Sequence, residues 1–240
     1  MPLAPTRIIP ITRKALSFDG VDDYVQVPHS DIFNSNSVTV AVYFRAFPGY
    51  GSGANSGLVA KRSGPPGSWI IVIHRSDGKI WGRVWQSDGT PIDIPAKFTI
   101  QPGTWYFAAL VADGSEAKLL VNGEQVSSAE YDGTILSTTY DITIGKQGAE
   151  YFNGEIAYVL IYNRALSDDE IAQIYNDPDH PPKSGLILWL HDTSIDTENN
   201  VWRDLSGNGN DATIYGATAV DVARPATRVL DATRVIEPTR

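Results

Sequence analysis

Short segments of strand-forming residues recur along most of this chain, and turn residues separate them. Two long alternating segments are Ser37–Phe47 and Thr104–Asp113. A Ser-Asp-Gly turn separates Ser68–Arg75 from Lys79–Gln86, and Asn122-Gly123 marks a further hairpin. Strands of this kind bury their apolar positions by packing one sheet face against another. Their even spacing predicts an all-β antiparallel sandwich or barrel.

One segment has the pattern of a helix instead. The run from Ser167 to Glu170 has the form of a capping box, and Ile171 and Ile174 follow on one helical face. Asn176-Asp177-Pro178 then provides a stop signal. We therefore expect one short surface helix on a β-sandwich, and 240 residues are enough for one such domain.

Charge and composition exclude several classes of function. The formal net charge is −9, which disfavours binding to nucleic acid. The chain contains no cysteine, so disulfides and thiolate metal sites are excluded. No apolar run approaches the ~20 residues that cross a bilayer as a helix, so membrane insertion is not expected.

Several motifs resemble those of a known family of modules. Ala15–Val27 and Phe152–Glu170 resemble the opening and closing signatures of laminin-G-like, concanavalin A-like modules. Between them, Gly103–Tyr106 and Leu119–Gly123 resemble that family's central hairpin. The resemblance covers about residues 15–176 and implies a concanavalin A-like jelly roll.

A further motif of the same family occurs out of its usual order. Gly185–Leu190 and Asp204–Ala217 resemble the segment that usually precedes the opening signature, whereas here it follows the closing one. A circular permutation or a second, truncated copy would explain this order. Permutation is favoured because no second opening strand follows. It predicts that residues 185–217 complete the same sandwich, with Gly185–Leu190 beside Gly154–Tyr162.

The patterns that would indicate an enzyme are missing. Glycoside hydrolases of related architecture need two carboxylates facing one cleft, usually alternating on one strand, and no strand here has that spacing. The four histidines are scattered, and no nucleophile elbow, phosphate loop or dinucleotide fingerprint occurs. We expect no catalytic residues.

Calcium is the one candidate cofactor, and none is expected to be required. Oxygen-bearing side chains crowd a glycine-rich loop: Asp204, Asn208, Asn210 and Asp211. A second, weaker cluster comprises Asp19, Asp22 and Asp23. In both loops, the alternative is that these side chains only build turns through bonds to backbone amides. The family's closing strand also commonly carries an acidic pair and a basic residue, where this chain has Ala157, Tyr158 and Leu160.

One strand carries a candidate glycan site. Trp81, Arg83 and Trp85 are two residues apart and so project from one strand face. Sugar rings stack on indoles, so a glycan platform requires both indoles to be exposed. The alternative is that the tryptophans cover the core.

The two ends of the chain share a repeat. Thr-Arg occurs five times, only near the termini, and the six-residue spacing puts the arginines of each end on one strand face. The predicted assembly residues are Arg7, Ile9, Ile11, Arg13, Arg228, Leu230, Arg234 and Ile236. Basic, β-prone arms on an acidic body suit docking onto a neighbouring subunit. Pairing of the arms with each other and disorder are the alternatives.

The sequence therefore predicts an N-terminal arm (1–14), a jelly-roll domain (15–220) and a C-terminal arm (221–240). The predicted function is a non-enzymatic structural or adhesive subunit of a filament, coat or fibre, outside the cell or on a cell or virion surface. Its main partner would be itself, as a homo-oligomer or polymer, with glycans as further candidate partners. The alternative function is a stand-alone, lectin-like carbohydrate-binding module, with or without calcium.

Overall fold

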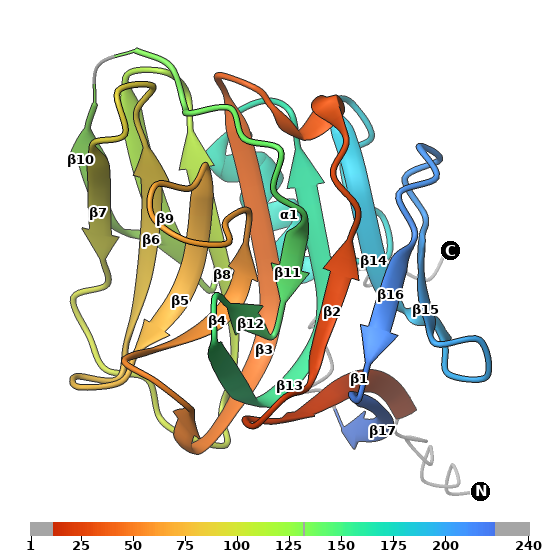
Figure 1. Cartoon of the computed structure of the whole chain (residues 1–240). Coiled ribbons are helices and arrows are strands. Elements are labelled where there is room, and N and C mark those ends of the chain that lie inside the picture. The colour runs from red at the N-terminus through yellow and green to blue at the C-terminus, as the bar shows by residue number, and fades with distance from the viewer. Residues whose placement is uncertain (1–11, 132, 224–240) are drawn as a thin grey trace, which may run out of the picture.

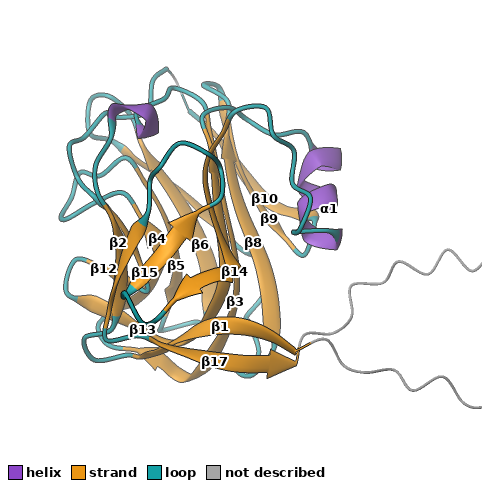
Figure 2. Ribbon diagram, turned by 90° about the vertical axis from the view of Figure 1, so that its right-hand side faces the viewer, coloured by secondary structure: helices purple, strands orange, loops and turns teal. Residues whose placement is uncertain are grey.

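The computed structural model describes residues 12–131 and 133–223, which form two antiparallel sheets packed face to face (Figures 1 and 2). The front sheet has the order β16–β2–β11–β4–β5–β6–β7. Its strands are β2 (Tyr24–Val27), β4 (Asn55–Ala60), β5 (Trp69–His74), β6 (Lys79–Trp85), β7 (Pro91–Pro95), β11 (Ile142–Ile144) and β16 (Ala212–Tyr215). The predicted concanavalin A-like jelly-roll sandwich is confirmed.

The back sheet has the order β17–β1–β13–β3–β8–β9–β10. Its strands are β1 (Thr12–Asp19), β3 (Val38–Gly51), β8 (Trp105–Ala112), β9 (Glu116–Val121), β10 (Glu124–Glu130), β13 (Glu150–Tyr162) and β17 (Thr218–Ala223). The two-residue strand β12 (Lys146–Gln147) pairs with the start of β13. A 3-10 turn covers Asp31–Phe33.

Two further strands join the sheets along one edge. β14 (Leu186–Asp196) pairs with β13, placing Trp189 opposite Leu160. β15 (Val201–Asp204) pairs with β14 and with β16, which continues the front sheet. The segment that is out of order in the sequence therefore completes the same sandwich, as permutation predicts, and does not form a separate domain.

The main core lies between the two sheets, where the inward side chains of both meet. On β3, Val40, Val42 and Phe44 point inward, whereas Ala41 and Tyr43 belong to a second apolar cluster on the outer face of the back sheet. This alternation follows the two-residue period of a strand. Inward-facing Gly82 on β6 leaves room for the opposite sheet, since a Cβ there would lie 2.9 Å from a methyl of Leu110.

The helix α1 (Asp168–Asn176) covers that second cluster with Ile171 and Ile174 (Figure 2). The predicted capping box is present: the Ser167 hydroxyl accepts from the Glu170 amide, and the Glu170 carboxylate accepts from the Ser167 amide. No helix in residues 12–131 and 133–223 is long and apolar enough to cross a membrane.

The described parts of the predicted arms pair with each other. β1 and β17 run antiparallel, with Arg13 opposite Val222, at the lower edge of Figure 2. Arg13 has partners within the fold, because its guanidinium donates to Asp179 (2.8 Å) and reaches Asp192 (3.5 Å). The assembly role of Arg13 stays a prediction. The other arm residues lie outside the described residues: Arg7, Ile9, Ile11, Arg228, Leu230, Arg234 and Ile236.

Candidate functional site

The predicted glycan residues of β6 lie on the outer face of the front sheet, but they do not form a platform. Trp85 is only 2% exposed, and the guanidinium carbons of Arg62 and Arg83 lie 5.1 and 5.3 Å from its ring centroid. Trp81 is half-buried and stacks against His74, with ring centroids 4.8 Å apart. The two-tryptophan stacking platform is therefore wrong, because Trp85 is covered by neighbouring side chains.

Arg83 is held in place on this face by a carboxylate. Asp93 on the neighbouring strand β7 lies opposite Arg83 in the register, and the Arg83 Nη2 donates to its Oδ2 at 2.9 Å. Cross-strand pairs of opposite charge are a common way to stabilise an exposed sheet face. Arg83 thus has a partner within the fold, and it separates Trp81 from Trp85.

A buried lysine fastens the segment that borders this face. Lys61, directly after β4, is 0% exposed, and its Nζ donates to the carbonyls of Thr138 (2.8 Å) and Tyr140 (3.0 Å). Its Nζ also lies 3.3 Å from His29 Nδ1. Burial lowers the pKa of Lys61 to about 8. Residues 136–141 are therefore fixed against the front sheet.

Next to this segment lies a cavity of about 560 Å³ on the outer face of the front sheet, which we call the front hollow. Its lining includes Gln26, Arg62, Ser63, Tyr140, Thr143 and Lys146. Gln26 and Thr143 point outward because their neighbours on β2 and β11 point into the core. The lining thus combines hydroxyl, amide, aromatic and cationic groups from three segments far apart in the sequence.

The lining of the front hollow carries two cations, Arg62 and Lys146, against one carboxylate. Lys146 Nζ lies 4.1 Å from the ring centroid of Tyr24 and 5.2 Å from that of Tyr151. The one carboxylate in the lining is Asp141, and its oxygens accept from the Gln26 side chain and the His29 amide. The front hollow therefore suits ligands with many hydroxyl groups or with negative charge.

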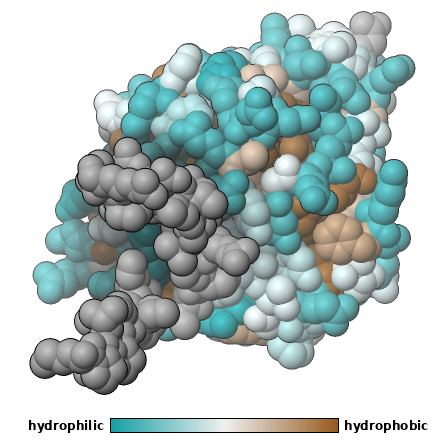
Figure 3. All heavy atoms as spheres, turned by 180° about the vertical axis from the view of Figure 1, so that it is seen from behind, coloured by the Kyte–Doolittle hydropathy of each residue, from teal (hydrophilic) through white to brown (hydrophobic). Residues whose placement is uncertain are grey.

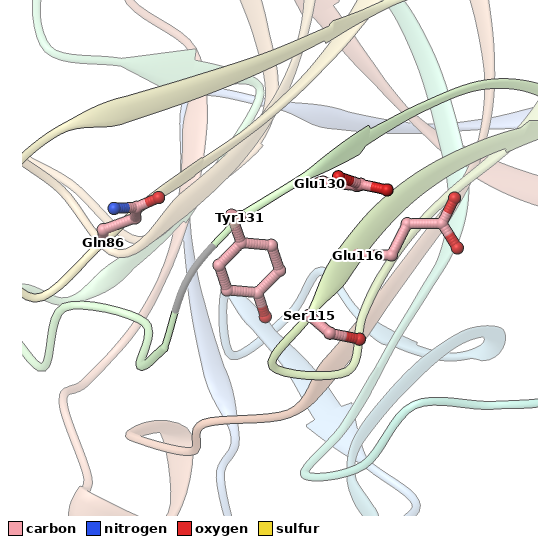
Figure 4. A pocket seen from close by; sticks show the side chains of 5 residues that line it. All are labelled: Gln86, Ser115, Glu116, Glu130 and Tyr131. Atoms are coloured by element: carbon pink, nitrogen blue, oxygen red, sulfur yellow. The ribbon is translucent and has the colours of Figure 1, made fainter.

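A second hollow, of about 740 Å³, lies beside the β9–β10 hairpin (Figure 4). It is lined by Gln86, Ser115, Glu116, Glu130 and Tyr131, and we call it the acidic hollow. Glu116 and Glu130 lie directly opposite each other across the two strands. A search for carboxylates alternating along one strand misses such a pair. Lys118 lies 3.5 Å from Glu116 and balances part of its charge.

The side chains of the predicted calcium loop form hydrogen bonds to backbone groups of the turn and of β14. The Asp204 carboxylate accepts from the amides of Trp189, Ser206 and Asn210, and Asp211 accepts from the Asp204 amide. The side-chain amides of Asn208 and Asn210 donate to carbonyls of residues 186 and 187. These bonds are those of the turn-building alternative. Calcium binding at this loop stays a prediction.

The weaker acidic cluster remains together in space. One carboxylate oxygen from each of Asp19, Asp22 and Asp23 lies within 4.8 Å of the others. Asp19 and Asp23 accept hydrogen bonds from backbone amides of the same loop. Burial raises the pKa of Asp23, and the charges of Asp19 and Asp22 act in the same direction.

The comparisons with known proteins agree with this architecture. A laminin G family model, described as "Concanavalin A-like lectin/glucanases superfamily", matches residues 19–172. The chain belongs to this superfamily. A comparison with curated protein sequences found no match.

Several solved structures are similar in fold to this concanavalin A-like chain at low sequence identity. A proposed carbohydrate-binding protein from Bacteroides ovatus has a TM-score of 0.71 at 20% identity, over 89% of this chain and 61% of that one. The chain therefore spans less than two thirds of that protein's length. The CBM40 domain of a Ruminococcus gnavus sialidase, bound to α2,3-sialyllactose, has a TM-score of 0.51 at 17% identity, over 66% and 96% of the two chains.

A third similar structure is domain 4 of an extracellular arabinanase from Geobacillus stearothermophilus, in complex with arabinotriose. Its TM-score is 0.53 at 18% identity, and the match covers 72% of this chain and 79% of that one. At these sequence identities the three similarities establish a shared fold and nothing further about this chain.

Sequence reasoning did not find Arg62, Lys146 or Glu130. Arg62 follows β4 in a proline- and glycine-rich loop, and Lys146 belongs to a two-residue strand. Neither stands in a periodic pattern, so no signal in the sequence marks them as neighbours.

Proposed function

We propose that this protein is a non-enzymatic carbohydrate-binding module whose ligand site is the front hollow. The observation that carries the proposal is the lining of the hollow: hydroxyl, amide, aromatic and cationic side chains converge on one cavity of the front sheet. A few convergent polar groups beside aromatic rings are typical of small-molecule and sugar sites. Glycans are the expected partners, and an extracellular location suits such a module.

This function is the alternative raised by the sequence. Membership of a lectin-containing superfamily supports it, and so does the likeness to carbohydrate-binding proteins and domains. None of the comparisons supports a filament, coat or virion subunit. Of the predicted assembly residues, all except Arg13 lie outside the described residues.

The test is a screen of the labelled protein against immobilised glycans, followed by two matched substitutions. Ser63 and Ser115 are both exposed serines, one lining the front hollow and the other the acidic hollow. We expect Ser63→Trp to fill the front hollow and lower glycan affinity at least ~10-fold, a loss of about 1.4 kcal/mol. Ser115→Trp should leave the affinity unchanged, and circular dichroism should show both variants folded.

Two outcomes would contradict the proposal. The first is that the wild-type protein binds no glycan on the array. The second is that Ser115→Trp abolishes binding while Ser63→Trp leaves it intact, which would move the site to the acidic hollow.

A further inference from the structure

Arg62 differs from the other described arginines because the described residues give its guanidinium neither a hydrogen-bond acceptor nor a carboxylate. Its Nε is buried without a hydrogen-bond acceptor, and no carboxylate pairs with its guanidinium among the described residues. The arginines that pair with carboxylates are Arg13, Arg45, Arg83, Arg164 and Arg203. Arg75 donates to two backbone carbonyls. The fold therefore supplies an acceptor to every described guanidinium except that of Arg62.

The position of Arg62 makes its charge costly. It shares the ring of Trp85 with Arg83, at 5.1 and 5.3 Å from the centroid. Burial, and next the charge of Arg83, lower the pKa of Arg62, and the charge of Glu150 acts in the opposite direction without reversing the shift. Arg83 already has Asp93, so that carboxylate is engaged elsewhere. An apolar side chain would cover Trp85 without this cost, whereas an anion in the front hollow would offset it.

A second cation faces the same hollow. Lys146 lies over the rings of Tyr24 and Tyr151 and forms no ion pair among the residues that the structure describes. Asp141 is the one carboxylate of the lining, and its oxygens accept hydrogen bonds from the Gln26 side chain and the His29 amide. This arrangement is not a general property of the surface, since the chain as a whole carries a net charge of −9. With two cations, Arg62 and Lys146, against one carboxylate, Asp141, the lining of the front hollow has a net positive charge on an acidic protein.

We propose that the front hollow selects acidic glycans, with Arg62 binding the carboxylate of a sugar and Lys146 adding positive charge. This inference rests on the proposed function and names its ligand class. A guanidinium presents paired N–H groups that match the two oxygens of a carboxylate, which gives direction as well as charge. A sulfate ester also offers charged oxygens that can accept from the paired N–H groups of the guanidinium. The exposed hydroxyls of Ser63 and Thr139 are placed to meet the sugar's own hydroxyls.

The experiment uses the full chain and an array that contains neutral, uronate-bearing, sialylated and sulfated glycans. The best ligand is then titrated by calorimetry beside its uncharged counterpart, the methyl ester or the desulfated form. Arg62→Gln should lower affinity for the charged glycan about 10- to 100-fold, the size of a lost charge-assisted hydrogen bond. Affinity for the uncharged counterpart should stay within about twofold. Arg62→Lys should recover part of the loss, because it restores charge without the fork.

Arg203→Gln is the matched control, since it removes the same charge from an exposed strand that does not line the front hollow. It should leave both affinities unchanged. Higher salt should weaken binding of the charged glycan only. If carboxylated and sulfated glycans bind with equal affinity, the site recognises negative charge of either kind. The assignment of Arg62 to a sugar carboxylate is then wrong.

The failures are separable. If only neutral glycans bind, and Ser63→Trp abolishes that binding while Arg62→Gln does not, the proposed function stands and the acidic-glycan inference falls. If no glycan binds at all, both fall together.

Discussion

The outer faces of the front and back sheets both carry an arginine over an aromatic ring, but Arg45 on the back face has a carboxylate partner that Arg62 on the front face lacks. On the back sheet, Tyr43 stacks between Trp105 and Tyr158, at 5.0 and 5.2 Å between ring centroids. Arg45 lies over Trp105 and bonds to Glu155. On the front sheet, Arg62 lies over Trp85 in the same manner and has no carboxylate partner among the described residues.

This difference separates an arginine that stabilises the fold from an arginine that is available to bind a ligand. The back face is partly closed by α1, and the view from behind in Figure 3 shows a mostly hydrophilic surface with small hydrophobic areas. The front face keeps an open hollow with two cations. An aromatic ring under an arginine therefore has no functional meaning by itself. What distinguishes Arg45 from Arg62 is whether the fold supplies a carboxylate to the guanidinium.

The largest expected effect concerns the ring stack of the back face. Tyr158 is 1% exposed, so Tyr158→Ala should destabilise the protein by about 3–5 kcal/mol through loss of packing and a cavity. Tyr158→Phe keeps the ring and should retain most of that stability. Denaturant unfolding measures both. Glycan affinity of the folded protein should be unchanged, and a loss of affinity equal to that of Ser63→Trp would end the division between the faces.

The next effect is the pH dependence from Lys61. Between about pH 8 and pH 10.5 the unfolded chain keeps a proton on Lys61 that the folded protein has released. Stability from this group therefore rises with pH in that window, and its burial cost is present in full below pH 8. The stability gap between Lys61→Met and the wild type should change by on the order of 2–3 kcal/mol from pH 7 to 10.5.

Denaturant unfolding of both proteins across that pH range measures the gap directly. An NMR titration of the Lys61 side chain should have its midpoint near pH 8, well below the ordinary value of 10.5. A midpoint near 10.5, together with a constant stability gap, would mean that the ammonium is not buried as the structure shows.

The smallest expected effect is the most direct comparison of the two arginines. Arg45→Gln leaves the buried carboxylate of Glu155 without its charged partner and should cost about 1–3 kcal/mol of stability. Arg62→Gln removes a charge with no described partner and should change stability by less than ~0.5 kcal/mol. Thermal unfolding of the two variants side by side checks this. Equal losses would show that Arg62 has a structural role.

The sequence by itself determined the sandwich, the helix and the strand pairing of the rotated segment. The two-residue period of β3 and the capping box from Ser167 to Glu170 are local signals, and each fixes its element through neighbouring residues. The motif order near Gly185 correctly placed β14 beside β13. The two-residue spacing of Trp81, Arg83 and Trp85 also put them on one strand face, because the alternation of side chains along a strand does not depend on the rest of the fold.

Only the tertiary structure decided which of those residues are open to a ligand. Trp85 is covered by Arg62, which belongs to the loop after β4. Arg62 also lines the front hollow, together with Tyr140 and Lys146 from other segments of the chain. The burial of a side chain depends on contacts between residues far apart in the sequence, and strand periodicity says nothing about them. The same reason explains Arg13, whose partners Asp179 and Asp192 lie more than 160 residues away. Charge and period are properties of the chain, whereas the presence or absence of a partner is a property of the fold.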